Sequence, residues 1–294
     1  MKYYLLTILI IIGTIPRLHG QMQVYYYGSN TRLVENLDNS HSYKEVNQKS
    51  ENKYVIKSFN KVGSQWERTV KERIKVQKNG DQLIRYNANT FFSRKMVRSI
   101  AKIGPDQYQF EENRGEITRR TGVSSNFLPL HLEGIVTEFH PNSQVKSISE
   151  YNDNQLISNE NWQSDGSKYI DSIFYSTDKG PEYKNGDAIF KRFLLQKLAD
   201  SKIDLTMIED EIVIGWVVME TGDIDGVIAL QGKSGELNRI LVGIISEMPG
   251  KWEPAILDGS IVRYFMTIPL NFKQNNTRFQ DIELSSGMLH YTSY

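Results

Sequence analysis

The sequence predicts an α+β C-terminal domain, an antiparallel sheet with packed helices, preceded by a β-rich hairpin and meander region. Apolar residues alternate with their neighbours between 212 and 218, which is typical of a half-buried strand. Between 237 and 248 the apolar spacing becomes helical. Before residue 125 the apolar runs are short and are separated by Asn, Gly, Asp and Ser clusters, which mark turns.

Residues 1–20 have the pattern of a signal peptide. Lys2 precedes an apolar run over 3–15, and Gly20 is a small residue at a plausible cleavage site. A membrane-spanning helix needs about 20 apolar residues, so this run is short for one. Cleavage after Gly20 predicts export to the periplasm. The alternative is that residues 3–15 remain as a short anchor in the inner membrane.

The segment 21–130 is predicted to be β-rich. Its strand candidates are 24–27, 53–60, 72–76, 82–86 and 107–110. Between Lys61 and Lys102 the chain carries eleven Lys or Arg residues against three acidic ones. One interpretation is a patch for an anionic partner, such as lipid headgroups or a cell-wall polymer. The other is a set of charged side chains on strands that simply face water.

The segment 131–180 is predicted to contain hairpin repeats, and the pattern begins just before it. Phe110, Phe139 and Trp162 each precede a polar pair and a turn, at a spacing of 23 to 29 residues. This arrangement resembles the variant MORN repeat, although Ser143 and Asn154 stand where that repeat has glycines. The resemblance implies stacked hairpins that act as a spacer or as a protein-binding surface.

The segment 181–272 begins after the predicted boundary at 177–181. A helix over 181–198 is expected to bury Phe190, Phe193 and Leu194. Two strands joined by a turn at Gly222 follow, then a helix over 236–248 and a strand over 261–272. Ser234 is the expected N-cap of the second helix. The tail, 273–294, is polar.

The end of this segment reads Trp252-Glu253-Pro254-Ala255, then Asp258-Gly259 and Val262, then Pro269 and Phe272. It resembles the C-terminal domain of TonB-type energy transducers, over about the last third of the chain. Its signature residues are Trp252, Pro254, Gly259 and Pro269. The resemblance implies a periplasmic domain that captures an extended peptide by adding it as a strand to a sheet.

No catalytic, cofactor-binding or metal-binding residues are predicted. The chain has no cysteine, and its five histidines lack metal-ligand spacing. Gly232-Lys233-Ser234 lacks the upstream glycine of a phosphate-binding loop. The formal net charge of zero gives no argument for nucleic acid, and no nucleic-acid partner is predicted. The chain is therefore not expected to be an enzyme.

The predicted function is protein binding in the envelope. Strand addition needs only an exposed strand edge, and the last strand is the predicted edge, with Ile261, Arg263, Phe265 and Thr267 as protein-binding residues. The predicted partner is a peptide of an outer-membrane transporter or another envelope protein, in energy-coupled transmembrane transport. The alternative is a structural scaffold or adaptor that uses the MORN-like hairpins, without energy transduction, and binds envelope proteins or peptidoglycan.

Overall fold

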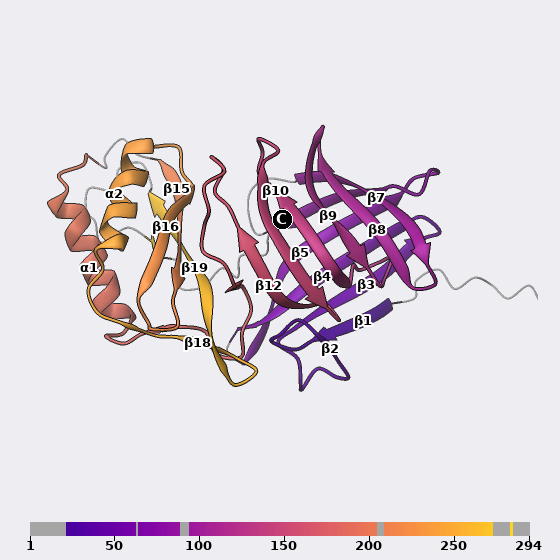
Figure 1. The fold of residues 1–294 in the computed structure, drawn as a ribbon, viewed down its shortest axis with the longest axis horizontal. Helices are drawn as coiled ribbons and strands as arrows, with labels where there is room; N and C mark the ends of the chain where they lie inside the picture. Colours follow the sequence, from indigo (N-terminus) through magenta and orange to yellow (C-terminus); the bar gives the residue numbers. More distant parts are fainter. Residues whose placement is uncertain (1–21, 63, 89–93, 205–208, 273–282, 285–294) are drawn as a thin grey trace, which may run out of the picture.

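Two large β-sheets dominate the structure, a computed structural model that describes residues 22–62, 64–88, 94–204, 209–272 and 283–284 (Figure 1). Twelve strands form one sheet and six form the other, while two short strands pair separately. The predicted signal peptide, residues 1–20, lies outside the described residues, as does nearly all of the tail, 273–294. None of the helices in the described ranges is both long and apolar enough to cross a membrane.

The twelve-stranded sheet is an antiparallel meander in which almost every strand pairs with its neighbours in sequence. All five strand candidates from the sequence are confirmed, and each is longer than predicted. The strands are β1 (Met22–Tyr27), β2 (Leu33–Val34), β3 (Ser42–Ser50), β4 (Lys53–Val62), β5 (Gln65–Val76), β6 (Gln82–Ala88), β7 (Arg94–Gly104), β8 (Gln107–Arg114), β9 (Ile117–Ser124), β10 (Leu132–Phe139), β11 (Val145–Asn152) and β12 (Gln155–Asn161).

One face of this sheet is buried. Ile74 of β5 lies opposite Ile84 of β6, and Ile56 of β4 lies on the same face; all three are at most 2 % exposed. Leu128, from the loop between β9 and β10, joins the same apolar cluster. Because successive strand residues point to opposite faces, the residues between these isoleucines point outward.

Contacts repeat at a separation of 22 residues in the hairpins β10–β11 and β11–β12. The ring of His131 contacts Asp153 at 2.9 Å, and the ring of His140 contacts the carbonyl oxygen of Trp162 at 2.9 Å. Ser143 and Asn154 adopt φ of 66° and 64°. Both therefore have the left-handed backbone that glycine favours, at the positions where the MORN-like pattern departs from glycine.

The smaller sheet has the strand order β13-β19-β15-β16, with β18 and β20 also paired to β19. Helices α1 and α2 lie side by side over one face of it (Figure 1). Its elements are β13 (Ile173–Phe174), α1 (Asp187–Asp200), β15 (Asp210–Val218), β16 (Ile224–Gln231), α2 (Gly235–Ser246), β18 (Ala255–Leu257), β19 (Ser260–Phe272) and β20 (Glu283–Leu284); β14 (Glu182–Tyr183) pairs with β17 (Trp252–Glu253).

Both faces of the smaller sheet are apolar. Alternate residues of β15, Ile212, Ile214 and Trp216, pack with the helices and are at most 1 % exposed. On the opposite face Val217 packs with Ile173 and Phe265. The predicted N-cap Ser234 is confirmed, since its side chain accepts a hydrogen bond from the Leu237 amide at 3.2 Å.

The predicted α+β fold class is wrong. Of the residues that the structure describes, strands hold 57 % and helices 11 %, and the twelve-stranded antiparallel sheet is the largest unit among them. The prediction gave most weight to the helical spacing in the last third. For the long polar segment before it, the pattern predicts a hairpin and meander region without a thick core, because half of each strand carries polar side chains that give no signal of burial.

A polar junction connects the two sheets. The Ser176 hydroxyl donates to the Ser29 carbonyl at 2.5 Å, and the Gln155 amide donates to the Asp258 carboxylate at 3.0 Å. Asp178 accepts from the Ser29 hydroxyl and, at 2.6 Å, from the backbone amide of Asp258. The predicted boundary at 177–181 therefore lies within this junction.

Candidate functional site

The strand predicted to dock a partner, β19, lies inside the smaller sheet. Strand β15 pairs with it in an unbroken register from Tyr264 to Phe272. Strands β13, β18 and β20 also pair with parts of β19. Four strands therefore contact β19, and it does not form the edge of this sheet.

The four predicted protein-binding residues of β19 have different surroundings. Ile261 is 55 % exposed and lies opposite Ile256 in the β18–β19 hairpin. The guanidinium of Arg263 pairs with Glu220 at 3.0 Å. Phe265 and Thr267 are only 6 % and 4 % exposed, and the Phe265 ring fills the space above Gly215, where a β-carbon would collide with it. The structure thus gathers these residues on one strand but buries two of the side chains.

The signature residue Trp252 belongs to an aromatic cluster beneath the helices. Its ring centre lies 5.3 Å from that of Tyr183 and 5.9 Å from that of Trp216. Its amide donates to the Gly222 carbonyl at 2.8 Å. A β-carbon at Gly222 would collide with the Trp252 carbonyl oxygen, so the turn before β16 requires glycine there. Trp252 thereby ties that turn to the core.

The other signature residues shape the chain around β19. Asp258 and Gly259 adopt φ of 48° and 76°, the left-handed values of a two-residue hairpin turn. Pro254 precedes β18 directly, and Pro269 lies within β19 opposite Val213. The signature residues Pro254, Gly259 and Pro269 have no side-chain group that could act in catalysis. Their role is to set the direction of the backbone.

Strand β16 is the outer strand of the smaller sheet. Within the described ranges it pairs with β15 alone. Two register shifts, near Val213 and near Val217 of β15, interrupt that pairing. An outer strand leaves a row of backbone N–H and C=O groups available, and irregularities of this kind limit indiscriminate pairing. Sequence reasoning missed this edge because the pairing order is set by contacts between distant segments.

The two faces of β16 contact different apolar clusters. Val227 packs with the core under the helices, whereas Ile228 and Leu230 pack with the cluster on the opposite face. The hydroxyl of Tyr169 donates to the Gly226 carbonyl at 2.5 Å. A strand added beside β16 would therefore meet apolar side chains on both faces.

The N-terminus of α2 already holds a carboxylate from this chain. Asp210 accepts hydrogen bonds from the amides of Lys233 and Ser234, at 2.6 and 3.1 Å. A phosphate group would need these same N–H donors. Asp210 therefore occupies the position at which the Gly-Lys-Ser turn would bind a phosphate.

A charged network lies on the buried face of the large sheet. Glu112 pairs with Arg98 at 2.5 Å and with Arg120 at 2.8 Å, and it is 3 % exposed. Burial alone would raise the pKa of Glu112, but the charges of Arg120 and Arg98 outweigh it and lower the pKa to about 2. An adjacent cavity of about 20 Å³ has room for about one water molecule. This network can hold the strands together but cannot admit a substrate.

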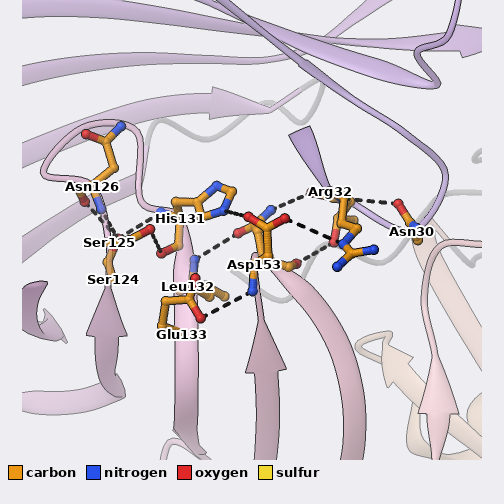
Figure 2. A network of polar contacts seen from close by, with 11 residues as sticks. Asn30, Arg32, Ser124, Ser125, Asn126, His131, Leu132, Glu133 and Asp153 are labelled. Carbon is orange, nitrogen blue, oxygen red and sulfur yellow. Dashed lines mark hydrogen bonds and ion pairs between the residues drawn. The ribbon is translucent and has the colours of Figure 1, made fainter. Parts of the chain in front are cut away.

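Three possible metal ligands meet near the junction, where no metal site was predicted. Figure 2 shows three side chains converging: His131 just before β10, Glu133 in β10 and Asp153 in the β11–β12 turn. Their donor atoms lie within 4.8 Å of one another. Arg32 lies 3.5 Å from Asp153, whose amide donates to Glu133 at 3.2 Å. Both carboxylates therefore already have partners within the chain: Asp153 has His131 and Arg32, and Glu133 accepts a hydrogen bond from the Asp153 amide. Sequence spacing did not indicate this group, because Asp153 lies 22 positions after His131 and only the fold brings the two together.

No protein-family model, no curated protein and no solved structure matches this chain. The resemblances to the TonB C-terminal domain and to the MORN repeat stay predictions from the residues.

Proposed function

We propose that this chain is a binding protein of the bacterial envelope that captures an extended segment of another protein by strand addition to β16. The observation that supports it is the position of β16 at the edge of the smaller sheet, with pairing on one side in the described residues. Main-chain hydrogen bonds supply most of the affinity in this mode, and pockets for alternate side chains supply specificity. Val227 on one face and Ile228 and Leu230 on the other provide apolar surface for those side chains.

The partner in this proposal is a peptide of an outer-membrane transporter or another envelope protein. The docking edge differs from the predicted one, because β19 has strands bonded to it and β16 is the outer strand. The fixed junction between the sheets would let the large sheet act as a spacer that carries the docking edge. Coupling to energy-driven transport is part of the proposal through the TonB resemblance only.

A single-cysteine label tests this function, since the chain has no cysteine of its own. Ala229→Cys places an exposed thiol in β16, and Ser158→Cys places an exposed thiol in β12, the outer strand of the large sheet. A transporter-derived peptide that carries a spin label should broaden or quench a probe at Ala229→Cys and leave the probe at Ser158→Cys unchanged. Equal effects at both positions, or none in a saturating titration, would contradict docking at β16.

A scaffold role is the second candidate, and the length of the large sheet favours it. Twelve consecutive strands form one continuous surface. A protein that binds envelope components through this surface would not need β16. Deleting the chain after residue 172 would abolish peptide binding under the first proposal and preserve envelope association under the second.

A further inference from the structure

The outward face of β4 to β7 gathers the basic residues of the middle of the chain. Arg73 on β5 lies directly opposite Arg85 on β6, which lies directly opposite Lys95 on β7. Lys75 lies opposite Lys53, and Lys71 lies opposite Lys57. Residues opposite one another in an antiparallel pair share a face, and so do alternate residues along a strand. The seven cations therefore form one array across four strands.

Most of this array lacks counter-charges. Glu45 pairs with Lys57 at 3.1 Å. For the other six cations, no ion pair with a carboxylate is found in the part of the chain that the structure describes. Five of the seven are exposed: Lys53, Arg73, Lys75, Arg85 and Lys95. Like charges directly opposite on neighbouring strands destabilise a sheet. A row of three such cations therefore works against folding, in a chain whose formal net charge is zero.

We infer that this basic face binds an anionic lipid surface. Neighbouring strands lie about 4.8 Å apart and alternate residues along a strand about 6.7 Å apart, so the cations form a two-dimensional grid. The grid covers the face of the sheet opposite to the one that carries the buried apolar cluster of Ile56, Ile74 and Ile84. A grid on an outward face matches a plane of phosphate headgroups, whereas a linear polyanion is matched by a single row or a groove. Basic clusters bind anionic lipids through the summed attraction of their charges.

The test measures sedimentation of the full chain with two kinds of vesicle, phosphatidylcholine alone and phosphatidylcholine mixed with phosphatidylglycerol. We expect binding to the anionic vesicles in excess of the neutral ones, and we expect that excess to fall as salt rises. The double variant Arg85→Glu/Lys95→Glu should bind anionic vesicles at least about tenfold more weakly. Its fold should survive, because both positions are exposed; circular dichroism checks this.

A matched control makes the result specific to the face. Lys191 and Arg192 are exposed on α1 and give the same change of charge when replaced by glutamate. Lys191→Glu/Arg192→Glu should bind anionic vesicles like the parent chain. Equal loss in both variants, or no preference of the parent chain for anionic vesicles, would overturn the proposal. So would tighter binding to dextran sulfate, a linear polyanion, at the same anionic charge.

Discussion

The two sheets bury their inner surfaces by different means. In the smaller sheet, apolar side chains cover both faces, and the central strand β15 contributes Ile212, Ile214 and Trp216 to the face under the helices. In the large sheet, one face is open to water and the other includes Arg98 and Glu112 next to its apolar cluster. A sheet covered on both sides can depend on the hydrophobic effect alone, whereas a long sheet covered on one side also uses paired charges in its interior.

The largest effect is expected in the apolar core of the smaller sheet. Trp216→Asp places a carboxylate at a position that is 1 % exposed, without a hydrogen-bonding partner. The smaller sheet should unfold, with loss of the near-ultraviolet circular dichroism of its tryptophans, while the large sheet keeps its β spectrum. Ile261→Asp, at a position 55 % exposed in the same sheet, should stay folded. If Trp216→Asp stays folded and monomeric, the assignment of the core is wrong.

The next largest effect compares a buried ion pair of the large sheet with an exposed one. Glu112→Gln should lower the free energy of unfolding by about 3 to 5 kcal/mol, because it leaves Arg98 buried without a counter-charge and removes the ion pair with Arg120. Urea denaturation measures the change. In the exposed pair of Lys168 and Glu160, 2.8 Å apart, Glu160→Gln should cost about 0 to 1 kcal/mol. Similar values for the two variants would mean that burial does not strengthen the interior ion pair.

A fall in pH should lower the stability of the large sheet, because Glu112 becomes protonated. Arg120 and Arg98 hold the pKa of Glu112 at about 2, below its ordinary value of 4.5. A lowered pKa gives stability that is complete above the ordinary value and is lost as the pH falls toward the folded value. About 3 kcal/mol should disappear between pH 4.5 and pH 2. Urea titrations over this range check it, and the loss should be smaller in Glu112→Gln.

A smaller effect is expected at the start of α2. Ser234→Ala removes the acceptor for the Leu237 amide and should lower the free energy of unfolding by about 1 kcal/mol. Thermal denaturation followed at 222 nm measures it. Ser234→Thr retains a hydroxyl acceptor without adding a charge beside Asp210 and should keep most of the parent stability. A loss in Ser234→Thr as large as that in Ser234→Ala would show that the hydroxyl acts in another way.

The smallest effect has the opposite sign. Arg85→Glu places an acid between Arg73 and Lys95 and should stabilise the large sheet by about 0.2 to 1 kcal/mol. Urea denaturation at low salt measures the gain, which should shrink at high salt. Arg192→Glu on α1 should give no such gain. A loss of stability in Arg85→Glu would mean that the three cations do not repel one another.

The sequence indicated the local elements better than their assembly. Alternation in β15, the spacing in α2 and the cap at Ser234 are short-range patterns, and the structure confirms them. The predicted docking strand lies between other strands because its neighbours come from residues 173–174, 210–218, 255–257 and 283–284. The ligand-like group around His131 likewise combines residues that no local pattern connects.

By itself, the sequence determined the five strand candidates of the large sheet, the alternation in β15 and the spacing and cap of α2, since periodicity and capping depend on near neighbours. It also determined that the middle of the chain is basic. Only the tertiary structure decided that the hairpins join into one twelve-stranded sheet, that β16 is an outer strand, and that Arg73, Arg85 and Lys95 stand in one row. The reason is physical: strand order and register are set by which surfaces bury one another, and a change of one residue in register would reverse every face.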